Sequence, residues 1–514
     1  TLITQVYLTE KTEKLFTLKK KGGKKLIINF TKKVRILTGM ILTLLIVIGG
    51  GVYVYQSKNS VQTSNIEEGK NLNKYIMDVI FDDESKRLMC NQNVEYVNNT
   101  NIALDKIYFH IYPNAFSKKE FAPFEKDEMN QAYPNGFNEG YIDIKNVLNN
   151  NNKLEYEIKG EKNDLLEVKI GRQLKPGEKI SIDMKFNVKI PNSEGRFGYG
   201  ENTINITNWF PIACVHDDRG WNLKSYEAIG DPFYSDTSNF YVKLLIPRKY
   251  KVGCTGNIIS EKSDSEKVLY EIQAKKVRDF AFILSDKFKI KKDTYKGVNI
   301  NTYNLNEKLS TEVTKIAKDS ISIFSNLFGE YPYDTYSVIA SDFYIGGMEY
   351  PTLVMIDQSL YNEKDKFLLE YVIAHETAHQ WWYSVIGNDE ISEPWLDEAL
   401  TEYSTVLYFE EKYGKEVGSK LIKTMEMQTR NHSSEDIFKA TTQYKNSIDY
   451  SLNVYTKGAL AFNEVRKKVG DEVFFETLKE YYNTYMCQNV NGAKFVDLWN
   501  KKGIDIDKII SEYK

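Results

Sequence analysis

Short runs in which apolar and polar positions alternate fill the chain from residue 73 to residue 305, with turn-forming clusters such as 149–152 between them. The clearest runs lie at 94–97, 107–112 and 180–186. Alternation places every second side chain on one face, as a half-buried β-strand requires. Regularly spaced strands of this kind predict an N-terminal β domain over 73–305, built as a sandwich or a saddle-like sheet.

The periodicity changes at about residue 306. Between 308 and 328 apolar side chains recur every three or four residues, as on one face of a helix, and Gly329 is a suitable stop. Two further helical patterns end before glycines, one over 364–386 and the other over 393–413. We therefore predict a mostly helical second domain over 306–514, which makes the whole chain an α+β multidomain protein.

The N-terminal region differs from both of these domains. Residues 36–56 carry no charge and are almost wholly apolar, whereas residues 1–35 are strongly basic. A helix needs about 20 apolar residues to cross a bilayer, and lysines gather on the cytoplasmic side. We predict a basic cytoplasmic segment, a transmembrane helix at 36–56, a polar linker at 57–72 and a body outside the cell membrane. The alternative is a signal peptide cut near 49–51, which would leave the body secreted.

Charge is distributed unevenly along the chain. The net charge is −3, and residues 1–35 contribute +8 from ten Lys/Arg and two Glu, so the remainder carries −11. An acidic body argues against a nucleic-acid partner, because nucleic-acid binding needs a basic face. The four cysteines form no CxxC pair, which argues against a cysteine-bound metal. Outside the cell Cys214 and Cys254 are a conceivable disulfide, and free buried thiols fit equally well.

The strongest chemical signal is an H-E-x-x-H sequence from His375 to His379, within the helix predicted over 364–386. Histidines at positions i and i+4 share one helix face, so both imidazoles can bind one ion. Glu376 is displaced around the helix, which suits a base that takes the proton of an attacking water. Because the chain has only five histidines, chance is a poor explanation. The pattern predicts one catalytic Zn²⁺ per chain.

A catalytic zinc site needs a third protein ligand. The helix predicted over 393–413, with Ser392 as its cap, offers three acidic side chains. They are Asp397, Glu398 and Glu402. Residue chemistry alone does not choose among them.

The spacing and the flanking residues resemble one known family. Eighteen residues separate His379 from Glu398, which stands in the context Trp-Leu-Asp-Glu-Ala-Leu. This arrangement is similar to that of the gluzincin zinc aminopeptidases, the aminopeptidase N and leukotriene hydrolase type. The resemblance implies that Glu398 is the third zinc ligand and that residues 306–514 form a thermolysin-like catalytic domain.

A second motif carries the same resemblance. The run Gly346-Gly347-Met348-Glu349-Tyr350 is similar to the family's G-x-M-E-N motif, which lies upstream of the zinc helix. The resemblance implies that Glu349 holds the free amino group of the substrate, with Gly346, Gly347 and Met348 beside it. Tyr350 departs from the usual Asn, which leaves the local substrate contacts open.

A third motif, at 454–460, resembles the segment in which the family has a tyrosine that stabilises the oxyanion. Tyr455 takes that position, and Tyr450 stands where relatives often have another active-site tyrosine. Stretches in the N-terminal half, at 112–115 and 208–211, also resemble the family's β domain. The resemblance thus covers about 70–514, and the large helical C-terminal domain of many relatives is expected to be absent.

The resemblance implies a bacterial, membrane-anchored peptidase that hydrolyses the N-terminal bond of peptides with a free N-terminus. Zinc would activate the water, and Glu376 would act as general base. Two alternatives remain: an endopeptidase of the thermolysin type, against which Glu349 argues, and a catalytically silent peptide-binding scaffold. The second alternative is disfavoured because Glu376, Glu398 and Tyr455 are all present.

Overall fold

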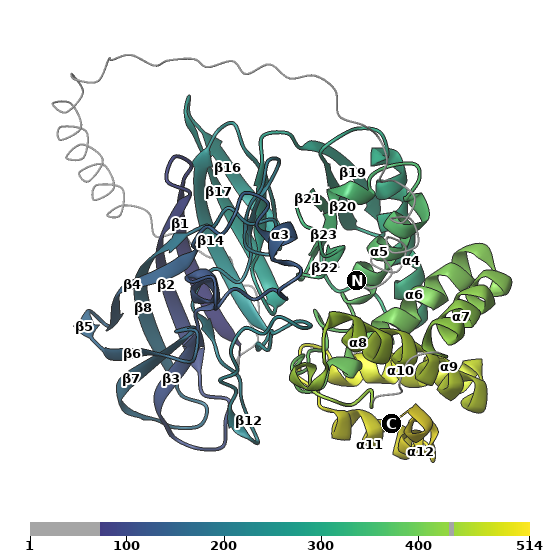
Figure 1. Cartoon of the computed structure of the whole chain (residues 1–514). Helices are drawn as coiled ribbons and strands as arrows, with labels where there is room; N and C mark the ends of the chain where they lie inside the picture. Colours follow the sequence, from purple (N-terminus) through teal and green to yellow (C-terminus); the bar gives the residue numbers. More distant parts are fainter. Residues whose placement is uncertain (1–71, 431–435, 514) are drawn as a thin grey trace. The chain divides into compact units, whose positions relative to one another are not determined.

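The computed structural model describes residues 72–430 and 436–513. The segments predicted at 1–35 and 36–56, and the linker except residue 72, lie outside the described residues. Within the described ranges, no helix is both long and apolar enough to cross a membrane. The described residues belong to one compact unit, with strands along the N-terminal half of the chain and helices along the C-terminal half (Figure 1).

The largest sheet has eight strands and belongs to the N-terminal half. In order across the sheet they are β16 (Asn257–Ser263), β17 (Lys267–Val277), β14 (Ser238–Pro247), β1 (Asn73–Asp82), β2 (Arg87–Val97), β8 (Lys179–Lys189), β4 (Tyr141–Asn149) and β5 (Asn152–Lys153). Alternation in the sequence becomes alternation in burial: from Ile180 to Val188 in β8, every second side chain is buried. One face of the sheet therefore needs an apolar cover.

Two four-stranded sheets contribute to the same hydrophobic core as the large sheet. One has the order β11 (Ile212–Ala213), β3 (Leu104–His110), β7 (Leu165–Leu174) and β6 (Glu155–Lys159); the other has the order β15 (Lys251–Cys254), β18 (Phe282–Ser285), β10 (Ile204–Ile206) and β9 (Gly198–Tyr199). Trp209 is fully buried and contacts Phe186 of the large sheet and Phe282 of a small one. Aromatic packing of this kind joins the sheets into one body.

The C-terminal half of the chain is built around a five-stranded sheet. Its order is β19 (Lys289–Tyr295), β20 (Val298–Asn304), β21 (Thr335–Ser341), β23 (Leu353–Asp357) and β22 (Gly347–Met348). Strand β20 pairs in parallel with β21, so the predicted boundary at residue 305 falls inside this sheet. The hairpin over 289–304 belongs with the C-terminal half. Alternation indicates that a strand exists, but it does not indicate which sheet the strand joins.

Helix α4 (Ser310–Phe328) ends before Gly329, as the pattern predicted. The next helix, α5 (Lys366–Ala378), is shorter than the predicted 364–386. The prediction is wrong at this end because residues 381–386 are all buried, and a helix at the edge of a core buries only one stripe. The chain instead turns at Tyr383, where φ is 131°.

Helix α6 (Glu398–Tyr413) also begins later than the predicted residue 393. A short 3₁₀ turn, η4 (Pro394–Leu396), precedes it, and Asp397 is its N-cap residue. Ser392 is not the cap, because Glu393 is the N-cap residue of η4 and Asp397 is that of α6. Pro394 does lie in the first turn of a helix, but that helix is the separate short η4 and not α6.

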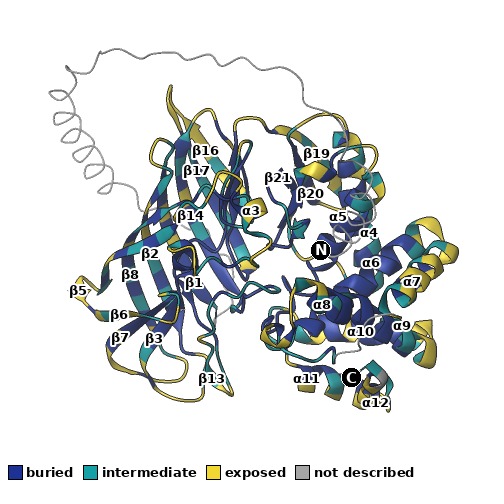
Figure 2. Cartoon of the chain, viewed as in Figure 1, coloured by how far each residue is buried: buried dark blue, intermediate teal, exposed yellow. Residues whose placement is uncertain are grey.

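Four further helices, α7 (Lys415–Thr429), α9 (Gly458–Val469), α10 (Asp471–Tyr485) and α11 (Gly492–Asn500), share a second hydrophobic core with the five-stranded sheet. Figure 2 shows that α6 is buried over most of its length, whereas α7 exposes one side. The four cysteines are free thiols, so the conceivable Cys214–Cys254 disulfide does not form.

One buried arginine ties the two halves of the chain together. Arg278 follows β17, and its guanidinium donates to the backbone oxygens of Ser235 (2.9 Å), Tyr383 (2.7 Å) and Gln488 (2.7 Å). The guanidinium lies against Gly387, where an added Cβ would be only 2.3 Å from Arg278 Cζ. The glycine after the predicted helix is therefore required by this contact and not by a helix stop.

Candidate metal centre and active site

The two histidines of the H-E-x-x-H sequence lie at the C-terminal end of α5. His375 is in the last turn, and His379 is the C-cap residue with helical dihedral angles. Their rings are one turn apart, with centroids 5.0 Å from each other. Both side chains are buried, because α5 lies within the core between the five-stranded sheet and the other helices. The predicted shared face is present.

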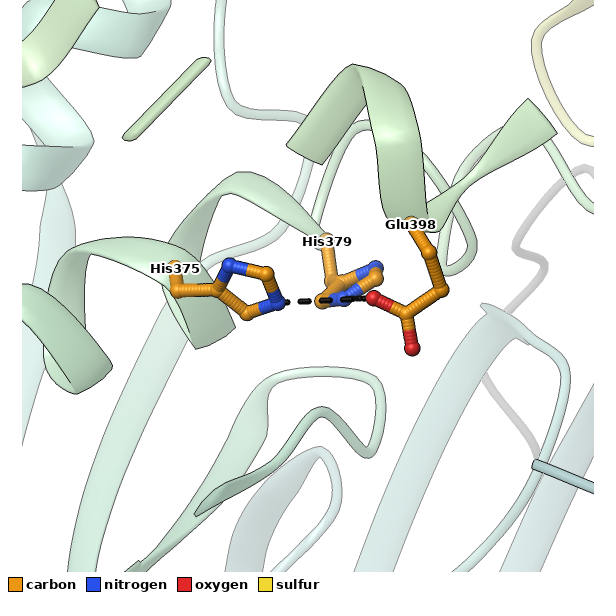
Figure 3. A group of neighbouring side chains, drawn as sticks. All are labelled: His375, His379 and Glu398. Atoms are coloured by element: carbon orange, nitrogen blue, oxygen red, sulfur yellow. Dashed lines mark ion pairs between the residues drawn. The ribbon is translucent and has the colours of Figure 1, made fainter. Parts of the chain in front are cut away.

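Glu398, the first residue of α6, completes this group (Figure 3). Its Oε2 atom lies 3.4 Å from His375 Nε2 and 3.2 Å from His379 Nε2. These three atoms fall within 4.8 Å of one another. Within the described structure Glu398 Oε2 has no hydrogen-bond partner of acceptable geometry. A buried carboxylate oxygen that approaches two imidazole nitrogens without hydrogen-bonding them suits a common metal ligand set.

The other two acidic candidates face elsewhere. Glu402 Oε2 lies 3.0 Å from His375 Nδ1, the ring nitrogen that points away from the ligand group. Asp397 Oδ1 accepts a hydrogen bond from Asn388 Nδ2 at 2.9 Å. The structure thus selects Glu398 as the residue that shares a site with both histidines.

Each histidine is oriented through its second ring nitrogen. His379 Nδ1 lies 2.9 Å from the backbone oxygen of Trp382, and His375 Nδ1 contacts Glu402. Glu402 is itself held by the hydroxyl of Tyr371 at 2.5 Å. Partners of this kind fix the ring orientation of metal-binding histidines and leave Nε2 for the metal.

The buried charged groups strongly shift one another's pKa values. Burial disfavours the charged form of His375, but Glu398 and Glu402 outweigh burial and raise the pKa of His375 to about 9. Burial also disfavours ionised Glu398, yet the two histidines hold its pKa well below the ordinary value. These interactions favour the ionised form of Glu398, which a metal ligand needs, whereas His375 must lose its proton before it can bind a metal ion.

Glu376 lies against the glycine-rich motif. An added Cβ at Gly347 would be 2.1 Å from Glu376 Oε1, so only glycine fits there. Gly346 has φ of 107°, which favours glycine for a conformational reason. Burial raises the pKa of Glu376 to about 7, against the opposite effect of His375 and His379. The two glycines therefore bring the motif strand into direct contact with the candidate base.

Glu349 and its neighbour Tyr350 point in different directions. Glu349 is 3% exposed and offers an oxygen within 4.8 Å of ligand atoms of Glu376 and His379. Tyr350 is fully buried, and its hydroxyl donates to Asn208 Oδ1 at 2.9 Å. The tyrosine that replaces the usual Asn thus attaches the motif to the N-terminal half and does not enter the site. Met348 is held by Arg196, whose Nε donates to its sulfur at 3.0 Å.

Tyr455 also reaches the site. It belongs to a π-helical turn, η6 (Leu452–Lys457), before α9. Its ring stacks on His375 with centroids 5.7 Å apart, and its hydroxyl donates to Glu398 Oε1. The ring of Tyr450 lies edge-on to that of Tyr455, with centroids 5.6 Å apart. Single π-helical turns are frequent at functional sites because they re-aim one side chain without ending the helix.

Two site residues have no signal in the sequence. Asp231 lies in the loop before β14, and its carboxylate has an oxygen within 4.8 Å of those of Glu349 and Glu398. Arg196, from the loop before β9, forms an ion pair with it. In the sequence Asp231 stands between Gly230 and Pro232, which reads as an ordinary turn. The N-terminal half therefore supplies part of the site.

A third residue missed by sequence reasoning is Glu390, in the segment between α5 and η4. It is 1% exposed, and one of its oxygens lies within 4.8 Å of oxygens of Glu349 and Asp397. An acidic residue in a polar loop is expected to be solvated, so its burial could not be foreseen.

Comparison with known proteins agrees with this geometry. Residues 312–513 match the Peptidase family M1 domain. The chain is 24% identical over 238 residues to bovine endoplasmic reticulum aminopeptidase 2, covering 43% of this chain and 24% of that protein. It is 24% identical over 405 residues to probable aminopeptidase 1 of Sulfurisphaera tokodaii, covering 72% and 48%. The chain thus spans about a quarter to a half of the length of these relatives.

Solved structures give the same fold. A mutant of the M1 zinc metallopeptidase of Deinococcus radiodurans, bound to the substrate Tyr-Ser-Ala, superposes with a TM-score of 0.63 at 16% identity, covering 86% of this chain and 93% of that one. The chain therefore shares the fold of this solved structure. The match of residues 312–513 to the Peptidase family M1 domain confirms the resemblance found in the motifs.

The donor set leads to a prediction about metal content. The protein beginning near residue 72 should bind about one zinc per chain, since two imidazoles and one carboxylate fix a single ion. His379→Ala removes one ligand and should lower the bound zinc to a small fraction of one equivalent after dialysis. Elemental analysis of the two proteins measures this, with His216→Ala, a described histidine that belongs to no candidate ligand group, as the control. Equal zinc in His379→Ala and wild type would remove the assignment.

Proposed function

We propose that this chain is a zinc-dependent aminopeptidase that hydrolyses the N-terminal peptide bond of peptides with a free amino group. The observation that supports the proposal most directly is the convergence of His375, His379 and Glu398, with the carboxyl groups of Glu376 and Glu349 beside His379. The aminopeptidase relatives and the peptide-bound Deinococcus enzyme support it.

The residues present fit zinc. Zinc accepts imidazole nitrogen and carboxylate oxygen, and a catalytic site keeps a position open for water or substrate. When bound, zinc would supply a Lewis acid and lower the pKa of water. Glu376 stands beside the ligand group and takes the proton of the attacking water. With a pKa of about 7, its carboxyl can accept that proton and then pass it to the leaving amine.

The free amino group of the substrate is the second recognition element. Glu349 and Asp231 each place an oxygen near the ligand group, one from the glycine-rich motif and one from the N-terminal half. Burial raises the pKa of Asp231, and Arg196, which forms an ion pair with it, acts in the opposite direction and favours the ionised form. Two carboxylates on this side of the metal would bind an ammonium group by charge-assisted hydrogen bonds. The fixed distance between ammonium and zinc then brings only the first peptide bond to the metal.

Tyr455 provides the hydroxyl donor. Its stacking on His375 and its hydrogen bond to Glu398 hold a phenol beside the ligand group. A neutral donor placed there stabilises the negative charge that develops on the former carbonyl oxygen. Tyr450, which lies behind Tyr455, is the second candidate for this role.

We also propose that residues 36–56 anchor the chain in the cell membrane, with 1–35 in the cytoplasm and the catalytic body outside. The support is the uncharged apolar run and the one-sided lysine cluster. The competing proposal is secretion after cleavage near 49–51.

The roles of Glu376 and Tyr455 lead to a kinetic prediction. Glu376→Gln keeps the shape and removes the base, so kcat should fall by about 10²–10⁴ with zinc content unchanged. Tyr455→Phe should lower kcat by about 10²–10³ and change KM little, because the hydroxyl acts on charge present only in the transition state. Steady-state kinetics on an aminoacyl anilide measures both. For Tyr455, an effect confined to KM would transfer the role to Tyr450.

The aminopeptidase assignment itself is tested with blocked substrates. Acetylation of the N-terminus removes a charge-assisted bond, so free aminoacyl anilides should be cleaved about tenfold to a hundredfold better than N-acetylated ones. Glu349→Gln should reduce this preference by impairing cleavage of the free substrate, whereas Glu363→Gln, an exposed control, should leave it intact. Efficient cleavage of blocked peptides that Glu349→Gln does not affect would instead identify an endopeptidase.

The anchor predicts where the full chain is found. Expressed in a bacterium, it should remain in the membrane fraction, with its body accessible to protease from outside, because the apolar run is long enough to span. The protein lacking residues 1–57 should be soluble and active. A mature N-terminus located just after residue 51 would show that the segment is a cleaved signal.

A further inference from the structure

Behind Glu349 lies a carboxyl group that the proposed reaction does not use. Glu390 is 1% exposed, and among the described residues neither of its side-chain oxygens has a hydrogen-bond partner. A buried polar group without a partner is strongly unfavourable, and a buried charge without one is more so. An ionised Glu390 would therefore be a buried charge without a partner, which is strongly unfavourable.

The nearest polar groups are acidic as well. Glu349 and Asp397 each place an oxygen within 4.8 Å of Glu390 and of each other. In the described part of the chain, Glu349 Oε1 and Asp397 Oδ2 also have no hydrogen-bond partner. Ionised carboxylates only accept hydrogen bonds, and three of them at this distance in a buried site repel one another. One proton shared within the group would remove a charge and supply the missing donor.

Glu390 is the member that holds this proton. In the described structure both oxygens of Glu390 lack a hydrogen-bond partner, whereas only one oxygen each of Glu349 and Asp397 does, and Asp397 Oδ1 accepts from Asn388 at 2.9 Å. Burial raises the pKa of Asp397 and of Glu349 as well, but His379 opposes this effect at both. At Glu390, burial and the neighbouring acids all favour the protonated form. Burial acts first, and the nearby acids then add to it, so the pKa of Glu390 is raised well above the ordinary value; those acids are Asp397, Asp231, Glu349 and Glu398.

We propose that Glu390 is a neutral carboxylic acid that donates a hydrogen bond to Glu349 and holds it in position as the anchor for the substrate's ammonium group. Glu349 Oε1 is the acceptor that we choose: Asp397 Oδ2 is also without a partner in the described structure, but the Asp397 carboxylate already has Asn388 as a donor at Oδ1. Glu390 is thus a positioning residue. The proposal rests on the ammonium-binding role of Glu349 proposed above.

The kinetic test uses two substitutions at residue 390. Glu390→Gln keeps the shape and an N–H donor, so KM for a free aminoacyl anilide should stay within about twofold of wild type. Glu390→Leu removes the donor at similar size and should raise KM about tenfold, the effect of one lost hydrogen bond to a charged group, with a smaller change in kcat. Glu363→Leu, on the surface, is the matched control and should change neither constant. An equal rise in KM for Glu390→Gln and Glu390→Leu would overturn the proposal.

A second measurement does not depend on activity or on the folding of Glu390→Leu. In the infrared difference spectrum of the zinc-loaded protein minus its Glu390→Gln variant, at neutral pH, the C=O stretch of a protonated carboxyl should appear. Absence of that band overturns the proposal. The three carboxylates could instead bind a second metal ion, and elemental analysis tests this alternative. A second equivalent of metal in wild type that is missing in Glu390→Gln would also overturn the proposal. If the band is present but blocked and free substrates are cleaved equally, the neutral acid stands and the aminopeptidase assignment fails.

Discussion

An excess of buried carboxyl groups around two imidazoles is the constraint that shapes this protein. Six acidic side chains gather in the interior at the junction of the two halves; they are Asp231, Glu349, Glu376, Glu390, Asp397 and Glu398. Such a group is stable only if cations, protons or hydrogen-bond donors offset the repulsion. In the described structure two histidines and Arg196 offset it in part, and the proposed zinc ion, the proposed neutral Glu390 and the ammonium group of a substrate would offset more of it.

This charge distribution explains why both halves of the chain are required. The helices alone would bring His375, His379 and Glu398 together, because α5 and α6 pack in one core. They would not supply Asp231 or its partner Arg196, which come from loops of the N-terminal half. Arg278 then fixes the register between the halves by donating to backbone oxygens of both. The metal site is therefore a property of the helices, and the substrate end of the site is a property of the junction.

Local departures from regular structure place the reacting groups. Helix α5 ends at Ala378, so that His379 lies at its cap and the chain can turn toward Glu398. The π-helical turn at Leu452–Lys457 directs Tyr455 to His375 and Glu398. Gly347 has no side chain, so the motif strand approaches Glu376 closely. Each irregularity lies where a regular element would carry the functional side chain away from the metal.

Sequence patterns alone predicted most of the elements, apart from their exact ends, and the metal chemistry, because both depend on short-range spacing. Alternation revealed the strands, helical periodicity revealed α4 to α6, and the i, i+4 histidines fall on one helix face whatever the rest of the fold does. The choice of Glu398 over Asp397 and Glu402 needed either the family resemblance or the structure, since all three lie on or beside the same helix. Only the tertiary structure decided that residues 289–304 join the C-terminal sheet, and that Asp231 and Glu390 lie in the site. These are contacts between segments that lie far apart in the sequence, and the residue pattern of one segment does not indicate which other segment it contacts.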